Sequence, residues 1–414
     1  MATVVLVGAL DTKGVEYGWV RDRLRELGVD VLLVDAGVLG EPGVLPDISR
    51  DAVAAVAGVD LGGLIAANDR GQAITAMAAG AASVVQALQS AGRLDAIMGL
   101  GGGGGSALIS EAMRALPVGV PKLLVSTVAS GDTRPYVGMT DLTLMHSVVD
   151  IAGINRISEP ILANACAAVA GMALDRVRQR PVLAERPLVA ATMFGVTTPG
   201  VTAVRGRLET LGYEVVVFHA TGIGGAAMEH LVRDGFFAGV LDMTTTELAD
   251  ELAGGVMSAG SDRLTGAGAV GIPQVVSLGA LDMVNFGPIE SVPERYRDRR
   301  LYQHNAAVTL MRTTPEECAE LGRRLASRLN GASGPVTLFI PRGGISSVAV
   351  VGGVFHDPDA DRALFEAVRE HASGNVRVVD ADTDINDPSL AVAMADELNR
   401  LIVGGPGSGE GNEA

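Results

Sequence analysis

The stretch VVLVGALDTKG at residues 4–14 decides how this sequence is interpreted, and LVAATMFGVTTP at residues 188–199 echoes it. Each stretch is an apolar run that breaks into a polar turn, rich in Gly or Thr, just before a segment with a helical pattern. In α/β proteins, nucleotides and acids bind at such turns, because the N-terminus of the following helix favours an anion. The two stretches therefore predict a ligand-binding sheet edge in each half of the chain.

Continuous apolar runs, rather than alternating ones, are typical of strands in a parallel sheet covered by helices on both faces. In the first half we expect strands at residues 3–8, 29–35, 95–100 and 121–127, and helices at 14–27, 71–91 and 106–115. A helical stretch is expected from residue 146 to about 180, and residues 36–69 are expected to be rich in loops with one short helix.

The same rhythm restarts at residue 188. Strands are expected at residues 188–194, 214–219, 238–242, 273–278, 336–340 and 376–380. Helices are expected at residues 200–211, 225–234, 245–253, 315–330, 360–372 and 388–402. A shift of 184 residues places Val20 on Val204 and Gly28 on Gly212, which indicates an internal duplication or two similar folds.

The fold class we predict is α/β, with two related doubly wound (Rossmann-like) parallel-sheet lobes facing a shared cleft. Residues 1–181 form the expected nucleotide-binding lobe and residues 187–403 the second, substrate-binding lobe. Residues 181–187 are the predicted linker. Residues 404–414 are the predicted disordered tail, because they are rich in Gly and carry little that could be buried.

Composition and charge limit the classes of partner that we expect for this protein. The formal charge of −16, with no basic run, makes nucleic acid and anionic membranes unexpected partners. The N-terminus enters a strand directly, and the sequence shows neither a signal peptide nor a long uninterrupted apolar run, so we expect a cytoplasmic protein. The apolar, Ala-rich helices favour a homo-oligomer. The two cysteines lack metal-ligand spacing.

Three polar turns follow neighbouring strands of the first lobe. The DTKG turn carries Lys13, one of only two lysines in a chain that otherwise uses arginine. The glycine run permits close backbone approach to phosphate oxygens, and Asp132 could hold Mg²⁺ together with phosphate or form a hydrogen bond to a ribose. A capped strand-to-helix turn, a flexible turn or an Asx turn would be the structural alternatives. The candidate cofactor-binding residues are Asp11, Thr12, Lys13, Gly14, Gly101, Gly102, Gly103, Gly104, Gly105, Ser106, Ser130, Gly131, Asp132 and Thr133.

The second lobe carries hydroxyl groups where the first carries glycines. Its Thr-rich turns, together with Asp242, Glu247, His219 and Asp282, would suit a small polar acid or sugar-like substrate, with His219 as a candidate general base. Arg312 is a candidate carboxylate clamp. A structural histidine and a first-turn helix glutamate are the alternatives for His219 and Glu247. The turn PRGGIS at residues 341–346 is a further candidate for anion binding.

These motifs carry a resemblance. GALDTKG, GGGGGS, SGDTRPY, ATMFGVTTP, FHATGIGGAAME, DMTTTEL, GALDMVNFG, HNAAVTLMRTT and PRGGIS together resemble the ATP-binding protein family that includes the N-terminal domain of the tomato mosaic virus resistance protein. The likeness runs to about residue 403. It implies two α/β lobes, with ATP on the DTKG, glycine-run and SGDT turns of the first.

We therefore expect an ATP-binding protein with Mg²⁺ as a companion ion. An ATP-dependent enzyme of small carboxylate or sugar-acid metabolism, acting by phosphoryl transfer or ligation, is the first hypothesis. A non-catalytic nucleotide-gated interaction module is the second. A hydrolase or lyase using His219, with nucleotide as effector, is the third.

Overall fold

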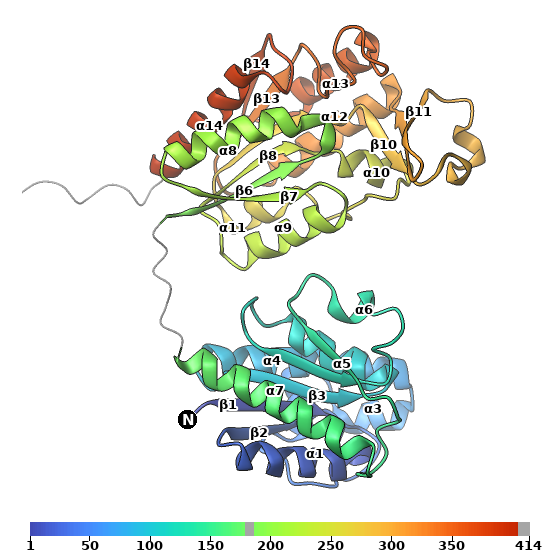
Figure 1. Ribbon diagram of the computed structural model, residues 1–414, viewed down its shortest axis with the longest axis vertical. Helices are drawn as coiled ribbons and strands as arrows, with labels where there is room; N and C mark the ends of the chain where they lie inside the picture. Colours follow the sequence, from blue (N-terminus) through green and yellow to red (C-terminus); the bar gives the residue numbers. More distant parts are fainter. Residues whose placement is uncertain (179–185, 405–414) are drawn as a thin grey trace, which may run out of the picture. The chain divides into compact units, whose positions relative to one another are not determined.

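A computed structural model of the chain describes residues 1–178 and 186–404 (Figure 1). The chain divides into two compact units, Met1–Val182 and Leu183–Ala414, which we describe one at a time as the first and second lobe. The predicted linker and the predicted tail fall largely outside the described residues. The expectation that the lobes share a cleft stays a prediction.

The first lobe contains a five-stranded parallel sheet in the order β2-β1-β3-β4-β5. Its strands are β1 (Thr3–Gly8), β2 (Asp30–Asp35), β3 (Ala96–Gly101), β4 (Lys122–Ser126) and β5 (Thr143–His146). Because the strand order reverses between β1 and β3, the chain leaves these two strands toward opposite faces of the sheet. In such sheets the carboxyl ends of the strands at this switch point form the usual ligand site.

Helices cover both faces of this sheet (Figure 1). One face packs against α1 (Leu10–Glu26) and α7 (Ser158–Arg178), and the other against α4 (Arg70–Ser90) and α5 (Gly103–Arg114). The shorter helices are α2 (Arg50–Val56), α3 (Leu61–Ala67) and α6 (Arg134–Val137). By length and composition alone, α4 and α7 could cross a membrane, but both contribute buried side chains to the two cores of this lobe.

The second lobe repeats the architecture with a six-stranded parallel sheet in the order β14-β13-β9-β8-β6-β7. Its strands are β6 (Leu188–Met193), β7 (Glu214–His219), β8 (Gly239–Thr244), β9 (Gln274–Gly279), β13 (Val336–Pro341) and β14 (Val376–Ala381). Taken in chain order, its first five strands have the arrangement of the first lobe, with the switch point between β6 and β8. The structure thus confirms the predicted fold of two Rossmann-like parallel-sheet lobes. The strand order that the two sheets share agrees with an internal duplication.

Helices also cover both faces of the second sheet. One face carries α8 (Thr198–Thr210) and α14 (Pro388–Val403), and the other carries α9 (Ile223–Arg233), α10 (Glu247–Ala253), α11 (Gly266–Val270), α12 (Pro315–Asn330) and α13 (Pro358–His371). Most of these bounds lie within a few residues of the predicted ones, because each helix begins or ends at a Pro, Gly or capping Asp or Thr.

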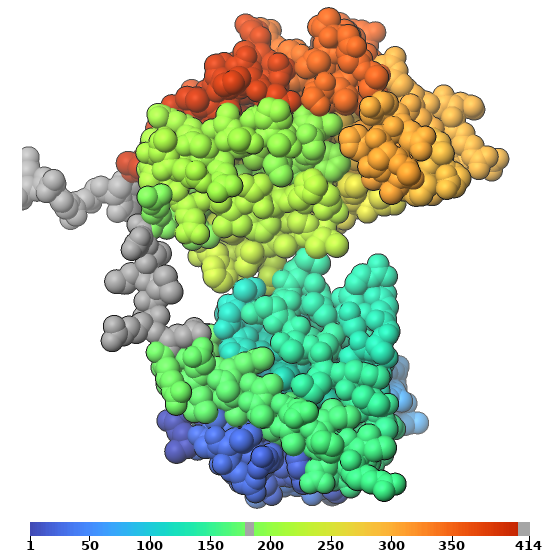
Figure 2. Space-filling model, viewed as in Figure 1, coloured from blue at the N-terminus to red at the C-terminus, as the bar shows by residue number. Residues whose placement is uncertain are grey.

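A small antiparallel sheet in the second lobe was not predicted. It has the order β10-β12-β11, with β10 (Met283–Phe286), β11 (Leu301–Asn305) and β12 (Val308–Arg312). The part of the chain that carries it, drawn in yellow and orange, forms one end of this lobe (Figure 2). Because β11 is largely exposed and polar, its sequence has the composition of a loop.

Candidate functional site

The sequence predicted the DTKG segment as a turn before a helix, but the structure shows that it forms the first turn of helix α1. Helix α1 begins at Leu10, and Lys13 breaks the helical geometry with φ −129° and ψ 26°. Gly14 is buried, and a Cβ on it would lie 2.6 Å from the Cα of Gly43, so it serves a close backbone contact. Thr12 is exposed, and its hydroxyl donates to the Ala9 carbonyl over 3.4 Å. This glycine and this hydroxyl are therefore poor candidates for phosphate contact.

The two charged residues of the segment hold loops in place. The Asp11 carboxylate accepts hydrogen bonds from the backbone N–H groups of Leu39, at 2.6 Å, and Gly40, at 3.3 Å. The Lys13 Nζ atom donates to the Ile151 carbonyl over 2.6 Å. Its other N–H donors remain available, so Lys13 can still contact an anion at this edge of the sheet.

The glycine run spans the end of β3 and the start of α5. Gly101 ends the strand, Gly102 occupies the N-cap position without a side-chain cap, and Gly103, Gly104 and Gly105 form the first helical turn. The N–H groups of a first turn have no acceptor within the helix. A Cβ on Gly101 would lie 2.7 Å from backbone atoms of Gly105 and Ser106, so this position requires glycine.

The interior side of this turn is closed by two hydroxyls. Ser106 is fully buried, and its Oγ atom lies 2.6 Å from the Oγ atom of Ser126 at the end of β4. The candidate phosphate contact of Ser106 is therefore replaced by a contact that links α5 to β4. The exposed backbone of the first turn is what remains for a ligand.

Arg70 was missed by the sequence analysis, although the structure places it beside the glycine run. Its guanidinium Nη2 atom lies 3.3 Å from the position that a Cβ on Gly104 would take. Arg70 is exposed, and across residues 1–178 and 186–404 it forms no ion pair. Arg70 is the first residue of α4 and lies far from the glycine run in sequence, so the residues around the run do not point to it.

The SGDT turn lies after β4, as predicted, and its carboxylate is already paired. Ser130, Gly131 and Asp132 are exposed, and Thr133 is the N-cap of α6. Asp132 accepts hydrogen bonds from the Arg134 side chain at 2.9 and 2.8 Å, and Arg134 holds the pKa of Asp132 down at about 2. Asp132 stays ionised at neutral pH but would have to share its oxygens to bind a metal ion.

A cluster of three or more His, Cys, Asp or Glu side chains able to hold a metal ion does not occur among the described residues. Mg²⁺ that accompanies a nucleotide needs only one or two protein carboxylates besides the phosphates. Asp132 fits that limited role, and the metal site stays a prediction.

Two of the four candidate catalytic residues belong to a buried ionic cluster. Arg263 is fully buried and donates from Nη2 to Asp242 over 2.7 Å and from Nε to Glu247 over 2.6 Å. Its Nη1 atom lies 3.4 Å from the Glu229 carboxylate. Burial raises the pKa of Glu247, while Arg263 opposes that shift. Asp242 and Glu247 are 1% and 0% exposed, so their contacts count against a direct role on a substrate.

The threonines of the second lobe point inward rather than toward a ligand. Thr192 donates to Asp242 over 2.7 Å, and the hydroxyls of Thr197 and Thr244 lie 2.7 Å apart. Thr245 donates to the Ser277 carbonyl over 3.1 Å. These hydroxyls satisfy buried polar groups at the switch point between β6 and β8.

Arg312 clamps a carboxylate of its own chain. It is 3% exposed and donates to Asp361 over 2.6 Å and to the Phe355 carbonyl over 2.8 Å. His219, in contrast, is exposed at the end of β7, where its ring centroid lies 5.6 Å from that of Phe194. Of the four candidates, His219 alone is placed where a ligand could reach it.

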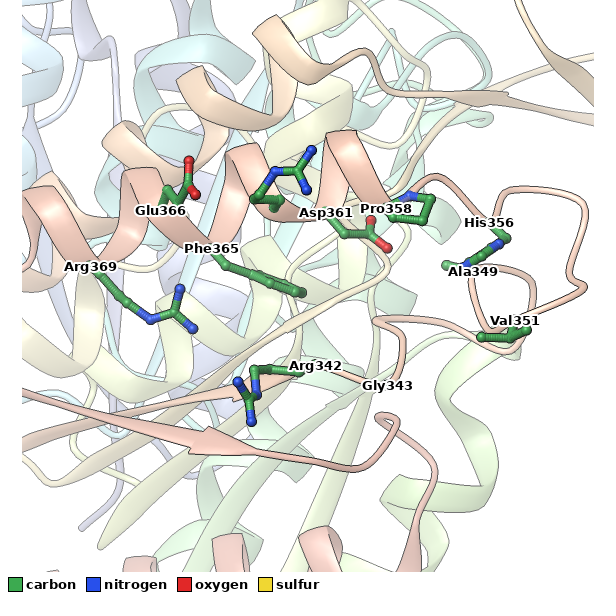
Figure 3. A pocket seen from close by; sticks show the side chains of 11 residues that line it. Arg342, Gly343, Ala349, Val351, His356, Pro358, Asp361, Phe365, Glu366 and Arg369 are labelled. Atoms are coloured by element: carbon green, nitrogen blue, oxygen red, sulfur yellow. The ribbon is translucent and has the colours of Figure 1, made fainter.

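A cavity of about 330 Å³ lies in the second lobe, beside the PRGGIS turn (Figure 3). The turn after β13 and the outer side of α13 supply its lining, including Arg342 from the motif itself. His219 does not contribute to this lining.

The fold and these edges define a class: a two-lobed α/β protein of Rossmann-like sheets, whose first lobe presents an uncapped glycine-rich helix start at its switch point. The chain belongs to the Uncharacterised protein family (UPF0261), whose N-terminal domain matches residues 2–178 and whose C-terminal domain matches residues 186–402.

Relatives include a UPF0261 protein of Clostridium tetani, 49% identical over 96% of this chain and 98% of that protein. The ToMV resistance protein Tm-1(GCR237) of Solanum lycopersicum is 45% identical over 80% of this chain and 45% of that protein. A solved UDP-N-acetylglucosamine 2-epimerase from Rickettsia bellii covers 97% of this chain and 98% of its own, at 9% identity and a TM-score of 0.24, too low to support any inference about function.

Proposed function

We propose that the first lobe binds ATP at the switch point between β1 and β3, and that the chain is an ATP-dependent enzyme of small carboxylate or sugar-acid metabolism. The observation that carries the nucleotide part is the start of α5, where a glycine-rich turn without a side-chain cap lies beside the unpaired guanidinium of Arg70. Backbone N–H groups and a nearby cation together favour phosphate.

In this proposal the first turn of α5 binds phosphate oxygens through the N–H groups of Gly103, Gly104 and Gly105. Arg70 adds a planar guanidinium that can donate two parallel hydrogen bonds to one phosphate. Lys13 adds a second positive charge from the opposite side of the switch point, where α1 begins. Mg²⁺, when bound, would screen phosphate charge with Asp132 as a protein ligand.

Phosphoryl transfer or ligation is the proposed chemistry because it needs little beyond positioning and charge stabilisation. A small acid as the acceptor is favoured by the cationic side chains around the cavity of the second lobe. The formal charge of −16 counts against nucleic acid and anionic membrane surfaces as partners. We also propose that the protein forms a homo-oligomer, because its helices are apolar and rich in Ala.

The second candidate is a non-catalytic nucleotide-gated interaction module. It is favoured by the burial of Asp242, Glu247 and Arg312, which leaves three of the four candidate catalytic residues engaged with their own chain. A hydrolase or lyase would use the exposed His219.

The test is isothermal titration of the full chain with ATP, followed by release of ADP and phosphate with Mg²⁺ and a panel of small acids. Saturable ATP binding that the Arg70→Gln substitution weakens supports the nucleotide site, and its absence overturns it. Turnover that depends on one acid supports the enzyme. ATP binding without turnover on any acid of the panel supports the interaction module instead.

A further inference from the structure

The cavity of the second lobe has the size and position of a ligand site. Its volume of about 330 Å³ lies at the lower end of the range of about 300–1,000 Å³ found for ligand pockets. It opens near the carboxyl end of β13, the end at which parallel sheets bind ligands. Phe365, 8% exposed, and Ala349, 1% exposed, give it an apolar floor.

Arginine side chains also line the cavity, next to its apolar floor. Figure 3 shows the guanidinium groups of Arg342 and Arg369 on the same side of the Phe365 ring, with Arg342 coming from the turn after β13 and Arg369 from α13. Arg342 pairs with Asp382 and Arg369 with Asp380, each through its Nη2 atom. Since a guanidinium has several N–H donors, each arginine retains donors for a ligand. Exposed pairs of this kind are weak and can exchange partners.

Two backbone N–H groups of the PRGGIS turn, a candidate for anion binding, already have acceptors within the chain. The Arg342 N–H donates to Ala381 and the Gly343 N–H to Thr383, both over 2.9 Å. These bonds join the turn to the loop after β14. The motif contributes the Arg342 side chain to the lining of the cavity.

Carboxylates in the lining restrict the kind of acid that fits. Asp361 lines the cavity while its Oδ1 atom accepts from Arg312 over 2.6 Å, and Glu366 lies further along α13. A polyphosphate would face both carboxylates at close range, which is unfavourable. A single carboxylate with hydroxyl groups fits better, because hydroxyls can donate to Asp361 and Glu366 while the carboxylate binds arginine.

We propose that this cavity binds a small hydroxycarboxylate, with its carboxylate between Arg342 and Arg369, its carbon chain on Phe365 and its hydroxyls toward Asp361 and Glu366. The role of this acid as substrate rests on the proposed function. The binding itself does not, because it requires no nucleotide.

The test is titration of the full chain with gluconate, tartrate and citrate, without ATP, and with butyrate as the acid that lacks hydroxyls. The expected result is saturable binding of at least one hydroxy acid and weaker binding of butyrate. Arg342→Gln and Arg369→Gln should each weaken the binding by about tenfold. Both side chains are partly exposed, so the fold should be retained.

The matched control is Arg323→Gln, which removes a similarly exposed, paired arginine from α12, outside the cavity. It should bind the hydroxy acid as the wild type does. The proposal is overturned if none of the hydroxy acids binds at about 10 mM, if butyrate binds as well as they do, or if both cavity variants bind like the control. ATP binding measured in parallel separates this failure from that of the nucleotide site.

Discussion

The guanidinium of Arg70 lies against the backbone of Gly104, with its Nη2 atom 3.3 Å from the position of a Cβ on that glycine. The two residues are far apart in sequence and belong to α4 and α5, which pack side by side on one face of the sheet. The contact places a cation beside a helix N-terminus that has no side-chain cap. Arg70 forms no ion pair within residues 1–178 and 186–404, which is why the proposed phosphate site includes it.

Replacing Arg70 by Gln should weaken ATP binding by about tenfold and leave the melting temperature unchanged, because the side chain is exposed and unpaired. Isothermal titration and calorimetry of the same samples measure both. Arg93→Gln is the matched control, since Arg93 is also exposed but follows the other end of α4. Equal ATP affinity for the wild type and both variants would remove Arg70 from the site.

Two neighbouring glycines should respond in opposite ways to alanine. Gly101→Ala places a Cβ 2.7 Å from backbone atoms of Gly105 and Ser106, so it should destabilise the first lobe by about 1–3 kcal/mol. Gly103→Ala meets nothing within 4 Å and improves helix propensity, so its stability should be equal or higher by up to about 1 kcal/mol. Urea denaturation measures the difference. Equal destabilisation by both substitutions would contradict this account of the turn.

The strands of the parallel sheets were predictable because most of them are short apolar runs and burial on both faces forces that pattern, although the largely exposed edge strand β5 was not predicted. The antiparallel sheet was not, since Gln303, His304 and Asn305 of its edge strand are exposed and polar. Strand β11 is held by backbone hydrogen bonds to β12, and such pairing does not require any particular side chains, so the polar sequence of β11 does not indicate a strand.

The position of a candidate site was predictable where it depends on the backbone. It was not predictable where it depends on which partners the side chains contact in the folded chain. The glycine run lies at the switch point as its sequence implied. Thr244 and Asp242 look like ligand-binding residues in sequence, yet the carboxylate of Asp242 balances Arg263 and the hydroxyl of Thr244 contacts Thr197. The partner Arg263 lies on a separate loop, so only the tertiary structure shows that these polar groups are already satisfied.

Arg263 should be the most sensitive charged position of the second lobe. Arg263→Met leaves Asp242, Glu247 and Glu229 buried without their counter-charge, which should cost about 3–5 kcal/mol. Calorimetry should show the transition of this lobe lowered by about 6–20 °C. Arg233→Met, which removes a partly exposed arginine 3.9 Å from Glu229, is the control and should lower it by a few degrees at most. A similar small shift for both variants would contradict the importance of the buried cluster.

Asp250 should make the stability of the second lobe depend on pH. Burial raises the pKa of Asp250 from its ordinary value to about 7, against the opposing effect of hydrogen bonds from Asn285 and Met257. A raised carboxyl pKa means that the folded state keeps its proton after the unfolded state has lost it. The contribution of Asp250 to stability should therefore be fully present below about pH 4, fall as the pH rises from about 4 to about 7, and level off above, by a few kcal/mol in all.

Asp250→Asn should remove much of this dependence because the amide is neutral at every pH. Asn285 now donates from Nδ2 to Asp250, and a rotation of its amide would turn Oδ1, which is buried without a hydrogen-bond partner among the described residues, toward the new amide group as an acceptor. Urea denaturation at pH 5 and pH 8 should show a loss of stability for the wild type on going to pH 8, and a clearly smaller loss for the variant. If both proteins lose the same amount, Asp250 is not the titrating group, and Asp282, whose pKa burial raises to about 6, becomes the position to substitute next.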